Sequence, residues 1–223
     1  MARTLIKNGT VVSPTGRHEV DVLIEGETIL ALLERGKSDS LNITADKVID
    51  ATGKFVVPGG IDVHTHMELP FGGTNASDTF ETGTTAAAWG GVTTIVDFAV
   101  QRYGENVQES LATWHKKAAG NCSIDYAFHQ IIGGIDEQAL ADMDYLVKNE
   151  GITSFKLFMA YPGVFYSDDG QILRNAAGQQ QRFNHHDACR KRHCNRRVGA
   201  AAHRTWRNRS EVSQLQPSKF VGR

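Results

Sequence analysis

The sequence predicts an α/β protein that consists of a small β module, the first half of a parallel βα barrel and a basic tail. In residues 1–57, short apolar stretches alternate with turn residues and show no helical periodicity. In residues 58–174, apolar strands alternate with segments of helical spacing, which is the pattern of parallel βα units. Residues 175–223 carry 11 of the 24 lysines and arginines but only 2 of the 25 acidic residues, so the composition changes abruptly there.

The N-terminal module, residues 1–57, is predicted to contain short antiparallel strands. The sequences NGT, SPTG and EGE between its apolar stretches favour tight turns, because Gly, Pro, Asn and Ser dominate such turns. The expected strands are Thr4–Asn8, Glu19–Ile24, Thr28–Leu33, Val48–Ala51 and Lys54–Val57.

Residues 58–174 are predicted to form four βα-type units, which is half of an eight-stranded barrel. The expected strands are Gly60–His64, Val92–Phe98, Ile124–Ile132 and Ile152–Phe158. The expected helices run from an N-cap at Asp78 through Trp89, near Asn106–Ala119 and near Asp136–Asn149. Catalytic groups of such barrels lie at the C-terminal ends of the strands.

Composition predicts a globular cytoplasmic protein without a membrane segment. Of the 223 residues, 40% are hydrophobic, which is enough for a core. No apolar run approaches the roughly 20 residues of a transmembrane helix, and the N-terminus lacks the apolar segment of a signal peptide. The three cysteines, Cys122, Cys189 and Cys194, form no disulfide framework.

The segment PGGIDVHTHM, residues 58–67, predicts a metal site. His64 and His66 are two residues apart, and residues at this spacing in a strand project to the same face. Both imidazoles can therefore reach one ion. The alternative is a pair of hydrogen-bonded histidines at the end of a strand.

Lys156 is the second informative position, because it lies inside an apolar strand next to Phe155 and Leu157. Burial of an ammonium group is costly and lowers the pKa of the amine, so we expect a neutral amine that can react with carbon dioxide. The resulting carbamate could bridge two metal ions. The alternative is a lysine that extends its charged end to solvent.

The sequences PGGIDVHTHMELPFGGTNASDTFETGTTAAAWGGVTTIVDF (58–98) and GITSFKLFMAYPGVFYSDDGQILR (151–174) resemble the hydantoinase/dihydropyrimidinase branch of the cyclic amidohydrolases. The resemblance covers Met1–Arg174. It implies a β-sandwich module at residues 1–57, followed at residues 58–174 by the first four βα units of a metal-dependent TIM barrel. It also implies a cytoplasmic hydrolase that opens the rings of hydantoins or 5,6-dihydropyrimidines.

The resemblance further implies roles for individual residues. His64 and His66 are similar to ligands of the more buried metal, and Lys156 to the carbamylated lysine that bridges both metals. Tyr161 is similar to the tyrosine that hydrogen-bonds the substrate carbonyl as it becomes an oxyanion. Four residues resemble the apolar loop residues of the substrate side-chain pocket: Leu69, Phe71, Phe158 and Phe165.

The chemistry implied by the resemblance requires two divalent metal ions, zinc with manganese as the alternative. These ions lower the pKa of a shared water, whose hydroxide attacks the ring amide while an aspartate carries the proton to the leaving nitrogen. The implied partner is a small cyclic amide, with no nucleic acid and no membrane, and the full-length family implies a homotetramer. Two further histidines and the aspartate have no matching motif after Arg174.

The tail, residues 175–223, is expected to be disordered and out of frame with the family. Its few apolar side chains cannot offset the entropy of ordering. Synonymous codons for His185–Arg197, read one base later, give Ile-Met-Met-His-Ala-Glu-Asn-Gly-Ile-Ala-Ile-Asp, which resembles the family's next metal-histidine segment. A shift in reading frame therefore explains the tail better than a zinc site does. The potential zinc ligands in it are His185, His186, Cys189, His193 and Cys194.

Alternative interpretations of the chain remain beside a cyclic amidohydrolase. The 223-residue form is expected to be inactive, so it could be a non-catalytic truncated fragment or pseudoenzyme. The basic tail could instead be a nucleic-acid-binding arm, although a shifted frame accounts for its arginines more simply.

Overall fold

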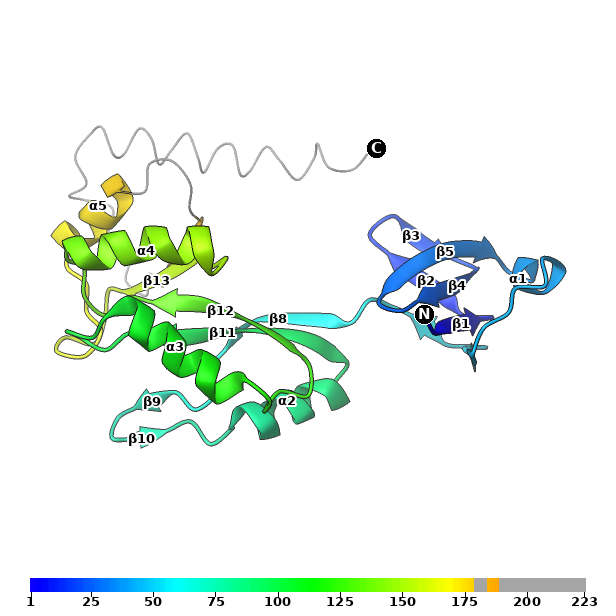
Figure 1. Cartoon of the computed structure of the whole chain (residues 1–223), viewed down its shortest axis with the longest axis horizontal. Coiled ribbons are helices and arrows are strands. Elements are labelled where there is room, and N and C mark those ends of the chain that lie inside the picture. Colours follow the sequence, from blue (N-terminus) through cyan, green and yellow to red (C-terminus); the bar gives the residue numbers. More distant parts are fainter. Residues whose placement is uncertain (179–183, 189–223) are drawn as a thin grey trace. The chain divides into compact units, whose positions relative to one another are not determined.

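The computed structural model describes residues 1–178 and 184–188. The chain divides into two compact units, which are described separately (Figure 1). Unit 1 comprises Met1–Gly60 and Gly91–Thr93, and unit 2 comprises Ile61–Gly90 and the residues from Thr94 onward.

Unit 1 contains two small sheets and one short helix. The first sheet has the strand order β5-β4-β1-β6 and the second has the order β3-β2-β7. Its elements are β1 (Arg3–Lys7), β2 (Thr10–Ser13), β3 (Gly16–His18), β4 (Val20–Glu25), β5 (Thr28–Glu34), α1 (Lys37–Ser40), β6 (Lys47–Asp50) and β7 (Phe55–Val56).

The prediction that the strands of unit 1 are antiparallel is wrong for two pairs. β6 runs parallel to β1, and β7 runs parallel to β2, whereas β1, β4 and β5 pair antiparallel. Strand β6 follows the connection through α1, and a long connection allows a strand to return in the same direction. The β2–β3 hairpin was not predicted, and its turn is the SPTG segment. The packing of the two sheets as a sandwich stays a prediction.

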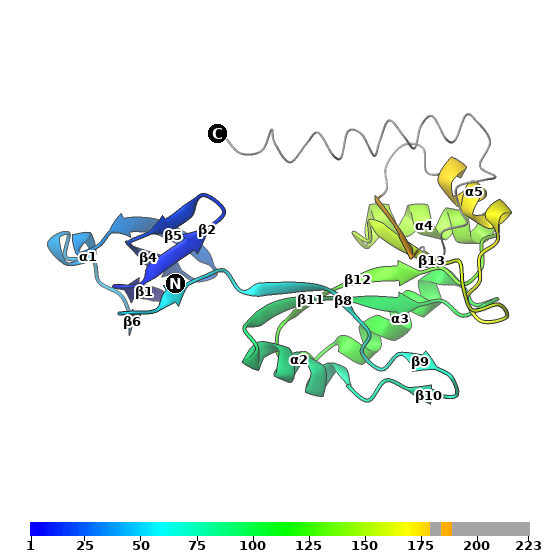
Figure 2. The same cartoon turned by 180° about the vertical axis from the view of Figure 1, so that it is seen from behind.

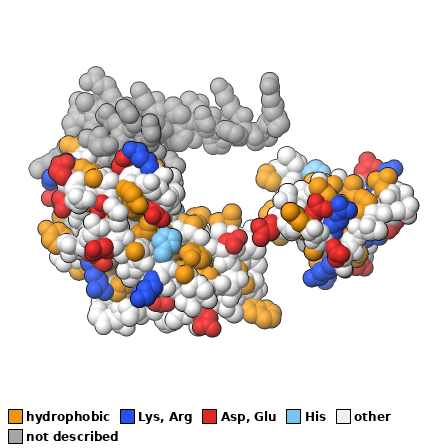
Figure 3. Space-filling view, in the orientation of Figure 1, with side chains coloured by type: hydrophobic (Ala, Val, Ile, Leu, Met, Phe, Trp, Pro, Cys, Tyr) orange, Lys and Arg blue, Asp and Glu red, His pale blue; other side chains and the backbone are white. Residues whose placement is uncertain are grey.

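The core of unit 1 is small, and many apolar side chains are exposed. Leu5, Val22, Leu23 and Ala51 are buried. Figure 3 shows hydrophobic side chains beside charged ones on the surface of this unit. The exposed large hydrophobic residues are Met1, Ile29, Leu30, Leu32, Leu41, Val48, Ile49, Phe55 and Val57.

Unit 2 contains most of a five-stranded sheet with the order β14-β13-β12-β11-β8. The pairs β11–β12, β12–β13 and β13–β14 are parallel, as βα units require. The remaining elements are a short hairpin, β9–β10, and the helices between strands. The bounds are β8 (Gly60–Thr65), β9 (Pro70–Phe71), β10 (Thr74–Asn75), α2 (Phe80–Trp89), β11 (Val92–Val100), α3 (Val107–Ala118), β12 (Asp125–Ile131), α4 (Glu137–Asn149), β13 (Ser154–Phe158), α5 (Asp169–Gly178) and β14 (Asn184–Ala188).

The helices α3 and α4 lie side by side along β11, β12 and β13, as both views of the ribbon show (Figures 1 and 2). The apolar stripe predicted for α3 is buried at Val107, Leu111 and Trp114. In α4, Met143 and Leu146 are buried in the same way. None of the helices in the described residues is both long and apolar enough to cross a membrane.

Side-chain caps fix where the helices begin. Asn106 and Asp136 are the N-caps of α3 and α4; Asn106 accepts hydrogen bonds from two backbone N–H groups of the first turn, and Asp136 accepts one. The predicted N-cap of α2 at Asp78 is wrong by one residue. Thr79 takes this position, because its hydroxyl and that of Thr82 form a reciprocal capping box.

Two segments of the region expected to be disordered are ordered in the structure. Residues 175–178 continue α5, and β14 pairs parallel with β13. The prediction of disorder is therefore wrong at residues 175–178 and 184–188. The rest of this region, including Cys189, His193 and Cys194, lies outside the described residues.

Candidate metal and substrate site

The two histidines of the predicted metal site lie at the end of β8 and share one aromatic neighbour. The ring centroids of His64 and His66 are 5.1 Å apart. Both rings contact Phe98 of β11, at centroid distances of 4.8 and 5.1 Å. Phe98 is 3% exposed, so its buried ring provides a packing surface for both imidazoles.

Lys156 of β13 meets this pair of histidines inside the unit. Its Nζ lies 3.5 Å from Nε2 of His64. The same Nζ lies 4.4 Å from the ring centre of Phe98 and 4.8 Å from that of Phe158. Lys156 is only 6% exposed, which does not fit the alternative of a lysine that extends to solvent.

The contact between Lys156 and His64 requires a strongly curled sheet. Strands β12 and β11 lie between β13 and β8. With neighbouring strands about 4.8 Å apart, three spacings amount to roughly 14 Å on a flat sheet. Curling toward the face that bears the two side chains shortens this separation until they touch, as in a sheet that begins to close into a barrel.

His66 has the properties of a metal ligand. Its Nδ1 is buried and has no hydrogen-bond partner among the described residues. Burial, followed by the charges of Lys156 and His64, lowers the pKa of His66 from 6.5 to about 4. A neutral imidazole with an unused nitrogen is the form that binds metal, so this residue does not fit the alternative of a hydrogen-bonded histidine.

The donor set present in the described residues fits a metal site completed by a modified lysine. No group of three or more His, Cys, Asp or Glu side chains that could hold an ion occurs in this part of the chain. Two imidazoles and the buried amine of Lys156 are the groups that come together. Carbamylation would convert that amine into the carboxylate-like ligand that divalent ions accept.

Asp97 is a residue of this region that sequence analysis missed. It lies in β11 and is 0% exposed. Its Oδ2 accepts hydrogen bonds from Thr65 Oγ1 at 2.7 Å and from the Met67 backbone N–H at 2.8 Å, and its Oδ1 accepts one from Trp114 Nε1 at 3.2 Å. Burial raises the pKa of Asp97, and these three donors oppose that effect.

His129 of β12 is the second missed residue, and it connects three strands. Its ring lies 4.7 Å from that of Phe98. Its Nε2 donates to the Val63 carbonyl at 3.0 Å, since a carbonyl can only accept. Its Nδ1 then accepts from the Ser154 hydroxyl. Both missed residues are polar side chains inside apolar strands, the signal that identified Lys156.

An aromatic cluster adjoins the lysine and contains four of the predicted substrate-site residues. The rings of Phe158 and Phe165 are 5.3 Å apart, and Phe71 stacks on Phe165 at 6.3 Å. Tyr161 contacts Phe71 at 5.3 Å and Phe158 at 5.8 Å. The described contacts do not place the side chain of Leu69 in this cluster, although its carbonyl accepts the N–H of Ala76 at 2.8 Å.

The backbone at Tyr161 is in the left-handed region, with φ at +65°. This conformation is uncommon for a residue other than glycine. The Tyr161 carbonyl accepts the N–H groups of both Val164 and Phe165 at 3.1 Å, which fixes the turn. Tyr161, which is 38% exposed, is thus held at the edge of the aromatic cluster.

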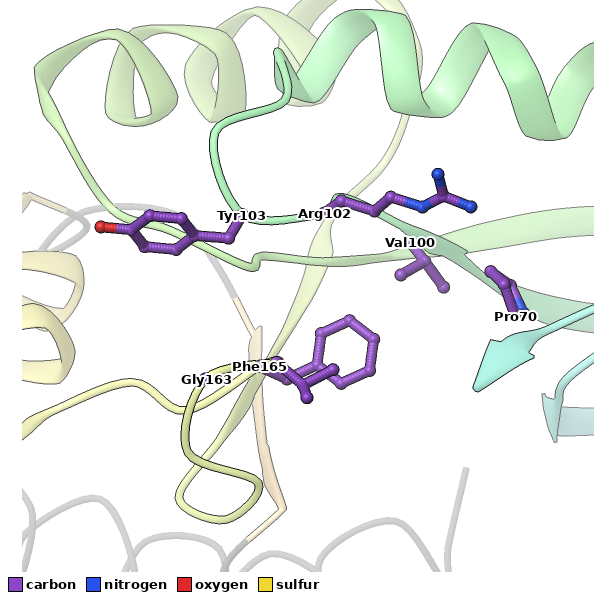
Figure 4. Close-up of a pocket in the computed structure, with 7 residues that line it drawn as sticks. Pro70, Val100, Arg102, Tyr103, Gly163 and Phe165 are labelled. Atoms are coloured by element: carbon purple, nitrogen blue, oxygen red, sulfur yellow. The ribbon is translucent and has the colours of Figure 1, made fainter. Parts of the chain in front are cut away.

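A cavity of about 250 Å³ lies beside this cluster, at the ends of β11 and β9. Phe165 belongs to both the cavity and the cluster. Figure 4 shows Arg102 and Tyr103 extending in opposite directions from the loop after β11. The lining residues are Pro70, Val100, Arg102, Tyr103, Gly163, Val164 and Phe165.

Comparisons with known proteins identify related sequences and structures. The model of the amidohydrolase family matches residues 47–121. The chain is 59% identical over 173 residues to a D-hydantoinase from Streptomyces coelicolor, and this match covers 78% of this chain and 37% of that protein. It is 48% identical over 177 residues to a D-hydantoinase from Geobacillus stearothermophilus, covering 79% of this chain and 36% of that protein.

Among solved structures, a dihydropyrimidinase from Brevibacillus agri matches with a TM-score of 0.74 and 45% identity. The match covers 79% of this chain and 37% of that structure. The chain thus spans little more than a third of the length of these relatives. Over the matched residues, the predicted resemblance to the hydantoinases and dihydropyrimidinases is confirmed, as is a mixed α/β fold with part of a parallel sheet.

Proposed function

We propose that residues 1–174 are the first part of a metal-dependent hydrolase that opens the rings of hydantoins or 5,6-dihydropyrimidines. The observation that carries this proposal is the convergence of His64, His66 and Lys156, which lie in or directly after two strands, β8 and β13, that are not neighbours in the sheet. The similarity to named D-hydantoinases and to a dihydropyrimidinase supports the choice of cyclic amides as substrates.

We assign metal binding to His64, His66 and Lys156. Neutral imidazoles supply two donors, and the low pKa of His66 keeps its ring unprotonated at neutral pH. Reaction of the Lys156 amine with carbon dioxide forms an N–C bond and releases one proton, which leaves a carbamate anion. When bound, two zinc or manganese ions would supply an acidified water and polarise the ring amide. The rings of Phe98 and Phe158 lie against the lysine amine and would limit the access of water to it.

Tyr161 and the aromatic cluster are proposed to orient the substrate. The Tyr161 hydroxyl would donate a hydrogen bond to the ring carbonyl, and this bond strengthens as negative charge develops on the oxygen. Phe71, Phe158 and Phe165 would pack against the ring substituent, since their rings already stack on one another. Leu69 is proposed to join this surface when substrate is bound.

The similarity to hydantoinases and dihydropyrimidinases also supports a proposal for how the chain is organised. Residues 1–57 would form a β-sandwich module, residues 58–174 the first four βα units of a TIM barrel, and residues 175–223 a segment outside the family pattern. A cytoplasmic location and a homotetrameric assembly are the corresponding proposals for the whole protein.

A hybrid protein tests the function of residues 1–174 directly. These residues would replace the matching part of the Streptomyces coelicolor D-hydantoinase, to which the chain is 59% identical. The hybrid should open dihydrouracil or hydantoin, lose this activity with a chelator and regain it with zinc or manganese. His64→Ala and Lys156→Ala should each reduce turnover below detection.

Two matched variants of the hybrid control for nonspecific effects. His18→Ala removes an exposed histidine of unit 1, and Lys148→Ala removes an exposed lysine of α4 whose only described ion pair is with Asp144 on the surface. Both should retain full turnover. An active hybrid whose His64→Ala or Lys156→Ala variant kept turnover within about tenfold would contradict the proposed roles.

A further inference from the structure

The Asp97 carboxylate accepts hydrogen bonds from Thr65 and Met67, the residues on both sides of His66. Thr65 and Met67 donate to one carboxylate oxygen at 2.7 and 2.8 Å. Trp114 of α3 donates to the other at 3.2 Å. The carboxylate therefore joins the last residue of β8 and the segment that follows it to helix α3.

Asp97 acts from the face of the sheet opposite to the imidazoles. Successive residues of a strand point to opposite faces. Phe98 contacts the rings of His64 and His66, whereas Asp97 contacts Trp114 of α3. The Met67 N–H lies beyond the end of β8, and the Asp97 carboxylate accepts its hydrogen bond there.

Further contacts hold the segment that follows His66. A Cβ added at Gly83 of α2 would meet the Met67 sulfur at 2.3 Å, so the Met67 side chain packs closely on that helix. Lys117 of α3 lies 3.6 Å from the Glu68 carboxylate and 4.5 Å from the centre of the Trp114 ring. Met67 and Glu68 are therefore tied to α2 and α3.

We infer that Asp97 is a positioning residue that fixes the His66 imidazole for metal binding, through its hydrogen bonds to Thr65, Met67 and Trp114. All three partners donate, and an ionised carboxylate is the side chain that accepts from all of them at once. Partners of this kind, outside the ligand shell, change metal affinity by about 10–100-fold when they are removed. The inference rests on the metal site proposed above.

A pair of substitutions separates positioning from a general contribution to folding. In Asp97→Asn, the amide must present its NH₂ group either to Trp114 or to Met67, and both of these groups are donors. Trp114→Phe removes the donor on the helix side. In the double variant, the Asn oxygen can accept from Thr65 and Met67 while its NH₂ group faces the phenylalanine.

The main measurement is zinc affinity of the 223-residue chain by competition with a chromophoric chelator. Asp97→Asn should weaken zinc binding at least about tenfold. Trp114→Phe should change it less than threefold, and Asp97→Asn/Trp114→Phe should return it to within about threefold of Trp114→Phe. His66→Ala defines the signal that belongs to this site.

The second measurement needs no metal. Hydrogen exchange at the Met67 amide of the metal-free chain reports the bond to Asp97 directly. Exchange should accelerate in Asp97→Asn and slow again in the double variant. Circular dichroism of each variant establishes that it is folded. If Asp97→Asn does not fold, Thr65→Val, which removes a single donor, should still weaken zinc binding severalfold.

Each outcome decides the inference. His66-dependent zinc binding that is unchanged in Asp97→Asn and Thr65→Val would overturn it while leaving the proposed metal site intact. A double variant that bound zinc no better than Asp97→Asn would also overturn it. The inference requires that restoring the match of donors and acceptors around residue 97 restores zinc affinity. Absence of any His66-dependent zinc binding would overturn both the inference and the proposed metal site.

Discussion

Replacement of Phe98 by leucine should weaken the fold and the metal site together. The ring is 3% exposed and lies 4.7–5.1 Å from three imidazoles, those of His64, His66 and His129. Each aromatic pair contributes about 0.5–1.5 kcal/mol beyond apolar burial, and neighbouring pairs do not add fully. We therefore expect Phe98→Leu to lower the free energy of unfolding by about 2–3 kcal/mol, measured by urea titration of tryptophan fluorescence.

The same substitution should lower zinc affinity at least about tenfold, because both imidazoles lose the surface that orients them. Phe128→Leu is the matched control. Phe128 is 5% exposed in the neighbouring strand and also contacts three aromatic rings, but none of these belongs to the proposed metal site. It should cost similar stability and leave zinc affinity within about threefold. Equal zinc affinities in the two variants would refute this reasoning.

Three further predictions concern other parts of unit 2. In the metal-free chain, the pKa of His66 is about 4 when folded and 6.5 when unfolded, so the unfolded state binds the additional proton between these values. The free energy of unfolding should therefore rise by about 1–2 kcal/mol from pH 4 to 6.5, allowing for solvent screening of this partly exposed ring, and His66→Gln should lack this rise. Gly133→Ala should lower the free energy of unfolding by about 1–3 kcal/mol in urea titrations, since its Cβ would lie 2.4 Å from the Gln101 carbonyl oxygen. The control Gly134→Ala, whose Cβ would have its nearest contact at 3.5 Å, should be nearly neutral. Equal losses of stability in the two variants would contradict this prediction. In the hybrid protein, Tyr161→Phe should lower kcat about 10²–10³-fold at unchanged zinc content, and unaltered kcat would exclude the proposed hydrogen bond.

The βα pattern of unit 2 was predictable because each strand and helix is encoded locally. The strand predicted at Val92–Phe98 extends to Val100, and the one predicted at Ile152–Phe158 begins at Ser154. The predicted boundaries of α3 and α4 fall on Asn106 and Asp136, which act as caps. Apolar period, turn residues and caps are all properties of short stretches of sequence.

The contacts of the candidate site could not be predicted in the same way. The partners of Asp97 and His129 lie up to 66 residues away along the chain, so no local spacing reveals them. The short strands β9 and β10 have two residues each, too few for a periodic pattern. The meeting of Lys156 with His64 depends on the curl of the whole sheet, which is a property of packing.

The separation of His64 and Lys156 by 92 residues has a consequence for when the proposed metal site can form during synthesis of the chain. At about 5–20 residues per second, the ribosome adds Lys156 roughly 5–18 s after His64. During this interval the nascent chain presents both imidazoles without the lysine. An ion captured then would be held by two donors alone and would exchange readily. The proposed metal site would therefore be complete only once the fourth βα unit has folded onto the third, so stable metal binding there would be a late event in the maturation of the chain.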